Sequence, residues 1–320
     1  MKKKLFPVII LMIALLIAGC GKEQSVGVRV GSLKGPTSIG LLNLMDKAEK
    51  GQTTDTYEFH MATGADELLP MLIKGELDIA LIPANAAANL YQKSDAGVQV
   101  IDINTLGVLY LVTGDDSIDE LSDLKGKTIY STGKGTTPEA ALRCVLRDNG
   151  FNDDDYTMEF KSEATEVATL LSEDPNAVGL LPQPFVTAAC MQNDSLKIVI
   201  DLNNEWDKIY SSQGKQLVTG VTVVRKAFAS EHPEAVKRFL QEHSASVTAI
   251  DIEATAAMAV EKGIIAKEPI AKKAIPMCNI VYIDGSKMKE ALSGYLDSLY
   301  EFNPEMIGGK LPEDDFYYVQ

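Results

Sequence analysis

Short apolar runs alternate with helix-like segments along most of the chain. Runs at 26–32, 56–62 and 77–83 each lead through a Pro, Gly or Asn turn into a segment whose apolar residues recur every three to four positions. Successive parallel strands need a crossover connection, which is usually a helix. The alternation therefore predicts parallel α/β sheets rather than a barrel or bundle of antiparallel strands.

The same pattern starts again after residue 116. A strand-like run, a glycine-rich loop and a helix follow, and from about 222 the chain turns mainly helical. Apolar segments at 104–113 and 217–225 run from one half of the pattern toward the other. We expect two α/β lobes, each a mostly parallel sheet with helices on both faces, joined by two crossover strands as a hinge beside a cleft. The expected division is 26–111 plus 222–320 for lobe 1 and 112–221 for lobe 2.

The first twenty residues have the organisation of a secretory signal. "MKKK" is a positively charged start, "LFPVIILMIALLI" is an apolar stretch too short to span a bilayer comfortably, and "IAGC" ends at Cys20. Small residues before a cysteine resemble a bacterial lipobox, in which the cysteine is lipidated. We expect residues 1–20 to be a lipoprotein signal peptide and 21–25 a polar tether. An uncleaved anchor or a chance cysteine is the alternative. The mature protein would be lipid-anchored on the extracytoplasmic side of the cell membrane.

Charge and cysteine content exclude several classes of function. The chain has 320 residues and a formal charge of −15, which repels phosphate backbones and makes nucleic-acid binding an unfavoured reading. The remaining cysteines, Cys144, Cys190 and Cys278, are odd in number and scattered, so they have neither metal-ligand spacing nor a disulfide framework. Small buried side chains are the favoured interpretation, and the sequence gives them no further role.

Two glycine-bearing loops occupy equivalent places in the two halves. "GSLKGPTSIGL" (31–41) and "STGKGTTPEA" (131–140) both follow a strand-like run and precede a helix. Each loop alone is most simply an ordinary capped turn. As a pair they lie at the carboxyl ends of strands, where open α/β sheets bind ligands, and both present hydroxyls beside a helix N-terminus. The pair predicts a two-sided polar binding site.

Other polar residues end the neighbouring strands. Thr63, Asn85 and Gln183 could hydrogen-bond a ligand, although Thr63 and Asn85 could equally cap helices. Tyr110, on the first crossover segment, could stack on an aromatic ligand or simply pack in the core. The sequence contains no G-x-S-x-G or H-E-x-x-H motif, so we predict no catalytic residue, no metal site and no cofactor.

These motifs together resemble a known family. "GELDIALIPANAAANLY", "NTLGVLYLVT", "LKGKTIYSTGKGTTPE" and "LLPQPFVTA", with the two loops and the lipobox, resemble substrate-binding lipoproteins of bacterial ABC importers, of the sulfonate, nitrate and thiamine-precursor binding type. The resemblance implies a type II periplasmic-binding-protein fold that closes on a ligand between its lobes. Carried over by position, its ligand contacts would include the following residues: Pro36, Thr37, Ser38, Thr63, Gly64, Ala84, Asn85, Gly133, Gly135, Thr136, Thr137, Gln183 and Pro184.

The expected function is capture of a small polar solute and its delivery to an ABC transporter permease. Anionic and heteroaromatic solutes both stay open, because no dedicated arginine or lysine can be placed in the site from the sequence. A monomer that performs no chemistry is expected. The alternatives are a small-molecule-processing enzyme on the same fold, as in menaquinone biosynthesis, and a surface lipoprotein that binds a macromolecule.

Overall fold

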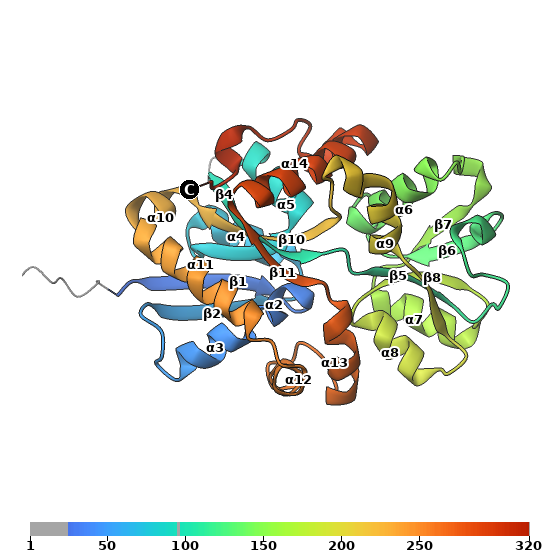
Figure 1. Cartoon of the computed structure of the whole chain (residues 1–320), viewed down its shortest axis with the longest axis horizontal. Helices are drawn as coiled ribbons and strands as arrows, with labels where there is room; N and C mark the ends of the chain where they lie inside the picture. Colours follow the sequence, from blue (N-terminus) through green and yellow to red (C-terminus); the bar gives the residue numbers. More distant parts are fainter. Residues whose placement is uncertain (1–24, 95–96, 320) are drawn as a thin grey trace, which may run out of the picture.

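A computed structural model describes residues 25–94 and 97–319 of the chain, so the predicted signal peptide and Cys20 lie outside the described residues. Two sheets form two lobes that lie side by side, with helices on both faces of each sheet (Figure 1). The predicted two-lobed α/β architecture with two crossovers is confirmed.

The first lobe is built on a six-stranded sheet of order β11-β4-β10-β3-β1-β2. Val28 and Val30 of β1 and the first four residues of β3 are buried, since helices cover both faces of the sheet centre. The strands are β1 (Gly27–Leu33), β2 (Thr56–Ala62), β3 (Ile79–Pro83), β4 (Val98–Leu106), β10 (Val218–Arg225) and β11 (Ile280–Asp284). Their helices are α2 (Pro36–Ile39), α3 (Leu42–Glu49), α4 (Ala65–Lys74) and α5 (Ala84–Lys93).

The second lobe repeats this arrangement on a five-stranded sheet of order β7-β6-β8-β5-β9. Its strands are β5 (Leu109–Thr113), β6 (Thr128–Ser131), β7 (Thr157–Phe160), β8 (Val178–Pro182) and β9 (Lys197–Asp201). Its helices are α6 (Thr137–Asp148), α7 (Ala164–Glu173), α8 (Phe185–Gln192) and α9 (Leu202–Tyr210), with the short 3₁₀ turns η1 (Leu121–Leu124), η2 (Asp153–Asp155) and η3 (Ser211–Gln213).

In each sheet most strands run in one direction, as predicted, but both sheets also contain antiparallel strands. β10 runs antiparallel to β3 and β4, and β5 runs antiparallel to β8 and β9. Both strands follow directly on a crossover. Each strand therefore begins at the end of its sheet that faces the other lobe. It runs away from that lobe, antiparallel to the strands on either side of it. The edge strand β11, which the sequence analysis did not identify, is also antiparallel to β4. The sheets are mixed.

The chain changes sheets at two short connections. β4 ends at Leu106 in the first sheet and β5 begins at Leu109 in the second, so residues 107–108 form the first crossover. The return runs from the end of α9 at Tyr210 to the start of β10 at Val218. Leu217 lies against Gly107, because a Cβ built on that glycine would stand 2.7 Å from Cδ2 of Leu217. The two crossovers are therefore adjacent.

The C-terminal segment contacts both lobes. It comprises α10 (Lys226–Glu231), α11 (Pro233–Thr248), α12 (Ile252–Glu261), α13 (Glu268–Ala274), η4 (Ile275–Met277), α14 (Gly285–Phe302), η5 (Pro304–Ile307) and η6 (Asp314–Phe316). α14 packs on β4 and also on α6, while α13 packs on α8 at the other side of the molecule (Figure 1). Tyr295 of α14 lies 5.8 Å from Trp206 of α9, centroid to centroid, and both side chains are fully buried. Trp206 is thus a core residue.

The three cysteines in the described part of the chain are free thiols. Cys144 and Cys278 are buried, and Cys190 is half-buried. Burial raises the pKa of Cys144 to about 11 and that of Cys278 to about 12, since the thiolate is disfavoured away from water. These thiols are small packing residues, which agrees with the interpretation favoured from the sequence.

A fully buried polar network lies beneath the first loop. Asp102 accepts a hydrogen bond from Thr222 at 2.8 Å and faces Nδ1 of His243 at 3.1 Å, and Asn104 donates to Thr222 at 3.1 Å. None of these side chains is accessible to solvent to more than 1%. The network joins β4, β10 and α11, so it fixes the returning crossover strand against the helices that follow it.

Removing the centre of this network should destabilise the protein strongly. Asp102→Ala leaves two buried polar groups, the Thr222 hydroxyl and Nδ1 of His243, without their partner, and we expect a loss of about 3–5 kcal/mol in the free energy of unfolding. Asp46→Ala is the matched control, because Asp46 pairs with Lys50 at an exposed helix surface, where loss of the pair costs about 0–1 kcal/mol. Urea unfolding of both variants measures the difference, and equal losses would contradict the role of the network.

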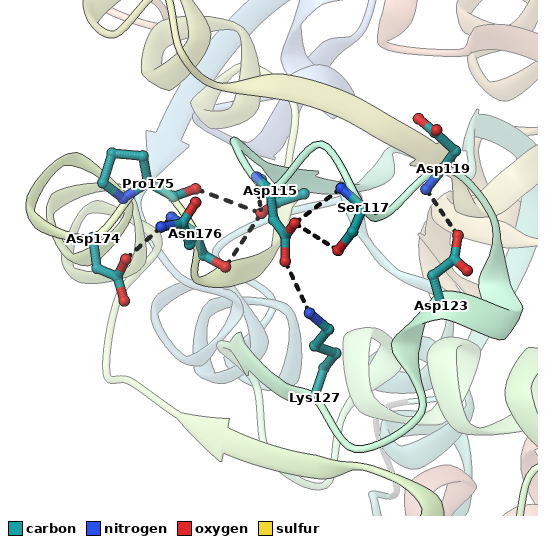
Figure 2. Close-up of polar contacts among 9 residues, drawn as sticks. Asp115, Ser117, Asp119, Asp123, Lys127, Asp174, Pro175 and Asn176 are labelled. Atoms are coloured by element: carbon teal, nitrogen blue, oxygen red, sulfur yellow. Dashed lines mark hydrogen bonds and ion pairs between the residues drawn. The ribbon is translucent and has the colours of Figure 1, made fainter.

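A second polar cluster fixes the outer end of lobe 2 (Figure 2). Asp115 accepts hydrogen bonds from the backbone and hydroxyl of Ser117, and its other carboxylate oxygen lies 2.8 Å from Nζ of Lys127. Thr113, at the end of β5, lies 3.5 Å from the carbonyls of Pro175 and Asn176. The cluster thus joins the end of β5 to the starts of β6 and β8.

The ammonium of Lys127 and the donors of Ser117 hold the pKa of Asp115 well below its usual range. A carboxylate with a lowered pKa in the folded state contributes stability above its unfolded pKa of about 4, and this contribution is lost as the pH falls further. Asp115→Asn should therefore destabilise the protein at pH 7 and make its stability less dependent on pH below about 4.

Urea unfolding between pH 7 and pH 2 checks this expectation. Asp116→Asn is the control, because the neighbouring Asp116 is almost fully exposed and pairs with Lys197 at 3.2 Å on the surface. The same acid dependence in wild type and Asp115→Asn would contradict the assignment.

Candidate functional site

The carboxyl ends of the parallel strands face the junction between the lobes. The last residue of β4 is followed within three positions by the first residue of β5 in the other sheet, so this end of β4 points at lobe 2. β1, β2 and β3 run in the same direction as β4. In lobe 2, Pro182 at the end of β8 pairs with Leu109 at the crossover, and β6 runs parallel to β8. All five predicted loops therefore start at the interlobe junction.

The first loop is held tightly against its own strand. The Ser38 hydroxyl lies 2.6 Å from the Leu33 carbonyl and 2.7 Å from the Ser32 hydroxyl, and Ser38 is completely buried. The Thr37 hydroxyl lies 3.2 Å from the same Leu33 carbonyl. Pro36 opens α2, whose preceding residue Gly35 has a φ of 155°. Ser38 anchors the loop, while Thr37 keeps a small exposed fraction of 8%.

The returning strand β10 passes directly beside this loop. A Cβ on Gly220 would lie 2.8 Å from Cγ2 of Thr37 and 2.5 Å from Oδ1 of Asn104. Only glycine therefore allows β10 to approach this closely. Asn104 links β10 to the Asp102 network, because its amide donates to Thr222 of that strand. The position of Thr37 is thus set by its own strand, through the Leu33 carbonyl, and by β10, which the network fixes.

The loops after β2 and β3 differ in whether a nearby carboxylate of the chain already accepts their hydrogen-bond donors. Thr63 donates both its hydroxyl and its backbone N–H to the carboxylate of Glu67, in the first turn of α4, beside Gly64. These hydrogen bonds lower the pKa of Glu67. In contrast, the first turn of α5, which opens with Ala84 and Asn85, contains no acidic residue. Ala84 is fully buried, and Asn85 is half-buried.

The glycine-rich loop of lobe 2 folds back on itself. Gly133 and Gly135 have φ angles of 71° and 73°, which side chains rarely adopt. The Thr136 hydroxyl donates to the Gly133 carbonyl at 2.6 Å and is exposed. The Gly135 N–H donates to the carboxylate of Glu139 in the first turn of α6. As at α4, one of the chain's own carboxylates accepts a backbone N–H beside a helix N-terminus.

Thr137 brings the two lobes together. Its hydroxyl stands 3.5 Å from Oδ1 of Asn85 in lobe 1. On its other side the Tyr295 hydroxyl of α14 donates to Oγ1 of Thr137 at 3.3 Å. Tyr295 is fully buried and Thr137 is 8% exposed. Polar groups from α14, α6 and α5 thus form a continuous line across the interlobe junction.

A second contact between the lobes involves Gln183 and Tyr110. Gln183, joined to Pro184 by a cis peptide, accepts a hydrogen bond from Thr187 at 2.8 Å, and its amide nitrogen lies 3.5 Å from the sulfur of Met277. The Tyr110 hydroxyl donates to the Met277 carbonyl at 2.8 Å. Both side chains are almost fully buried. In this structure Gln183 and Tyr110 therefore contact the C-terminal segment.

Sequence reasoning missed three residues at this junction. Tyr295, Met277 and Asn104 belong to apolar or β-rich stretches that are typical of core segments. A usable signal existed only for Tyr295, since a buried tyrosine hydroxyl needs a hydrogen-bond partner. Met277 and Asn104 reach the junction through long-range packing that no local pattern encodes.

The arginines of the chain are engaged elsewhere. Each of the five pairs with a carboxylate, and none lies on a loop that follows β1, β2, β3, β6 or β8. Lys34 and Lys134 lie on the two glycine-bearing loops and are exposed. The polar side chains that contact one another across the junction are neutral hydroxyls and amides, while the ammonium groups of Lys34 and Lys134 belong to exposed side chains.

No group of histidine, cysteine, aspartate and glutamate side chains within 25–94 and 97–319 could hold a metal ion. The helices in this part of the chain also include none that is long and apolar enough to cross a membrane.

Solved structures share the fold of this chain. An ABC transporter from Parabacteroides distasonis shares 24% identity and a TM-score of 0.73, covering 93% of this chain and 100% of that one. The periplasmic aliphatic sulphonate binding protein SsuA from Escherichia coli shares 14% identity over 88% of this chain and 90% of that one, with a TM-score of 0.71. The alkanesulfonate-binding protein from Xanthomonas axonopodis pv. citri, bound to MOPS, shares 13% identity over 90% and 94%, with a TM-score of 0.65.

No curated protein matches the chain. A family model does: the one described as ABC transporter, phosphonate, periplasmic substrate-binding protein matches residues 46–266, more than two thirds of the chain. The protein therefore belongs to the phosphonate-type periplasmic substrate-binding family of ABC transporters, whose members bind a small solute for import.

Proposed function

We propose that this protein captures a small solute with a tetrahedral oxyanion head, of the phosphonate or sulfonate class, between its two lobes. The predicted loop residues would hold the solute, and the protein would perform no chemistry on it. The observation that carries the proposal is the line of polar groups from Tyr295 through Thr137 to Asn85, which joins the lobes at the carboxyl ends of their strands. Open α/β sheets bind ligands at this edge.

The charges around the junction support a head group with a single negative charge. All five arginines are paired with carboxylates, so a bound anion would be compensated by hydroxyl and amide donors and by a helix N-terminus. Glu67 and Glu139 already occupy the backbone donors beside α4 and α6. The first turn of α5, at Ala84 and Asn85, carries no carboxylate and suits the anion best.

Closure would couple binding to delivery. A solute shifts the equilibrium between open and closed forms only if it binds the closed form more tightly, which requires contacts to both lobes at once. Thr37 and Asn85 from one lobe and Thr137 from the other meet this requirement. The closed, liganded form would then dock on an ABC transporter permease as a monomer.

The chain's organisation completes the proposal. Residues 1–20 would be the lipoprotein signal peptide, with Cys20 lipidated so that the protein is anchored on the outer side of the cell membrane. Lobe 1 would comprise 26–111 and 222–320, and lobe 2 would comprise 112–221. The strand pairing indicates that the hinge itself lies a few residues earlier at each crossover, since β5 pairs only in the second sheet and β10 only in the first.

A thermal-shift screen tests the function. Alkanesulfonates, alkylphosphonates, nitrate and pyrimidines are added separately, and a true ligand at a hundred times its Kd should stabilise the fold by about 2.7 kcal/mol. Stabilisation by a sulfonate or phosphonate that is recovered unchanged supports the proposal, and a preference for sulfonates supports the single charge. Chemical conversion of the ligand would indicate an enzyme. The absence of a shift with every small molecule would favour a macromolecular partner.

Two hydroxyl substitutions should weaken binding without unfolding the protein. Thr37→Val and Thr137→Val keep the side-chain shape but remove one hydrogen-bonding group each, and we expect each to reduce affinity about three- to tenfold. Titration calorimetry with the ligand from the screen gives the affinities. Thr169→Val is the control, because that hydroxyl is exposed on α7 and bonds only within its helix. Wild-type affinity in both site variants would contradict the site.

The lipid anchor has its own test. Cys20→Ser removes the thiol that would be acylated, so the protein should move from the membrane fraction to the soluble fraction of the producing cells. Cys190→Ser, which changes a half-buried thiol of the folded domain, should stay with the membranes. Retention of Cys20→Ser in a detergent-extractable membrane fraction would exclude lipidation at this residue.

A further inference from the structure

The first crossover is held from both sides by asparagine side chains. Gly107 donates its N–H to Oδ1 of Asn203 at 3.2 Å, and its carbonyl accepts a hydrogen bond from Nδ2 of Asn279 at 2.6 Å. Asn203 lies at the start of α9, in lobe 2, and Asn279 immediately precedes β11, in lobe 1. The two peptide groups that flank Gly107 are thus bound to different lobes: the N–H to lobe 2 and the carbonyl to lobe 1.

Asn279 has an unusual backbone that suits this task. Its φ is 43°, and it is the one non-glycine residue with a positive φ among those that the structure describes. Asparagine tolerates this left-handed conformation better than most residues, but the conformation still costs free energy. Its own carbonyl accepts a hydrogen bond from the N–H of Leu106 at 3.0 Å. Asn279 therefore binds two consecutive residues of the crossover.

The backbone of the first crossover is closely packed at Gly107. A Cβ on Gly107 would lie 2.6 Å from Oδ1 of Asn203 and 2.7 Å from Cδ2 of Leu217, on the returning crossover. Any rotation of one lobe about this point must therefore change the contacts of Asn203, Asn279 or both. A hinge of this kind has its preferred angle set by side chains that touch its backbone.

The same segment also reaches the predicted site. Two residues before Asn279, Met277 accepts a hydrogen bond from Tyr110 and contacts the amide of Gln183, both in lobe 2. Gln183 in turn donates its backbone N–H to the carbonyl of Val108, on the crossover. Residues 277–279 thus contact the hinge backbone and a predicted ligand residue together. They connect the lobes without a covalent crossing.

We propose that Asn279 and Asn203 are positioning residues that set the hinge angle at Gly107, and that residues 277–279 favour the closed arrangement through Met277. This inference rests on the proposed function only in that closure serves ligand capture. The residues act on the lobe equilibrium and not on the solute itself. Weakening them should shift the ligand-free protein toward more open forms.

Asn279→Gly is the decisive variant. Glycine adopts the positive φ without strain, so the backbone and the Leu106 hydrogen bond are kept while the amide donor to Gly107 is lost. Asn149→Ala is the matched control, because the Asn149 amide also donates to a backbone carbonyl, that of Val145 at 2.8 Å, at the end of α6 away from the hinge. Small-angle X-ray scattering of the ligand-free proteins measures the radius of gyration and the spread of interlobe distances.

We expect a larger radius of gyration for Asn279→Gly than for wild type or Asn149→Ala. In Asn203→Ala, hydrogen exchange at the Gly107 N–H should be about three- to tenfold faster than in wild type, as expected for the loss of one hydrogen bond. Scattering curves that superimpose for wild type and Asn279→Gly would overturn the inference, even if the variant melts at a lower temperature, since that result indicates a purely structural role. An opened Asn279→Gly variant combined with a wild-type protein that binds no solute would instead reject the proposed function and leave the hinge assignment standing.

Discussion

The whole structure depends on the requirement that one chain cross between two sheets twice. Each crossing delivers a strand to the centre of a sheet from the side that faces the other lobe, so β5 and β10 are antiparallel to the strands around them. This single constraint explains the matching strand orders of the two lobes. It also requires a glycine at residue 220, where the returning strand passes the first loop too closely for a side chain.

The same constraint places polar groups where they are costly unless they are paired. β10 carries Thr222 into the protein interior, where its hydroxyl bonds to Asp102 and Asn104, and Asp102 in turn faces His243. Because a buried polar group without a partner costs roughly 1–3 kcal/mol, this network makes one placement of β10 much better than its alternatives. Thr37 lies against Gly220 of that strand, so the network that fixes β10 also fixes the position of the first loop. Packing and site geometry therefore have a common origin in the returning crossover.

Much of the fold could be predicted from local patterns, whereas most of the junction could not. The alternation of apolar runs and helical segments is a property of short windows, and it placed the loops after β1 and β6 at the edge where they lie. The direction of β10 depends on the lobe from which the chain enters the sheet, and a short stretch of sequence does not show this. The same holds for β11, a short edge strand after a 3₁₀ turn, and for the contact of Met277 with Gln183, which joins residues 94 positions apart. The predicted hydroxyls also differ in their surroundings. The Ser38 hydroxyl is buried and contacts both the Ser32 hydroxyl and the Leu33 carbonyl, and residue type alone does not distinguish it from Thr37.

The neutral character of the junction bears on how such a protein can release what it binds. A transport protein must hold its solute long enough to reach the permease and then give it up when the lobes separate. A bidentate arginine makes hydrogen bonds to an oxyanion that are roughly twice as strong as neutral ones, and a single lobe can provide it. Hydroxyls and amides contribute about 1 kcal/mol each, so appreciable affinity requires several of them together, drawn from both lobes. In this chain the arginines are neutralised elsewhere, and Glu67 and Glu139 occupy donors that an anion would otherwise use. Under the proposed function, affinity would then depend on closure, since the predicted donors come from both lobes. Opening of the lobes would therefore be sufficient to release the solute.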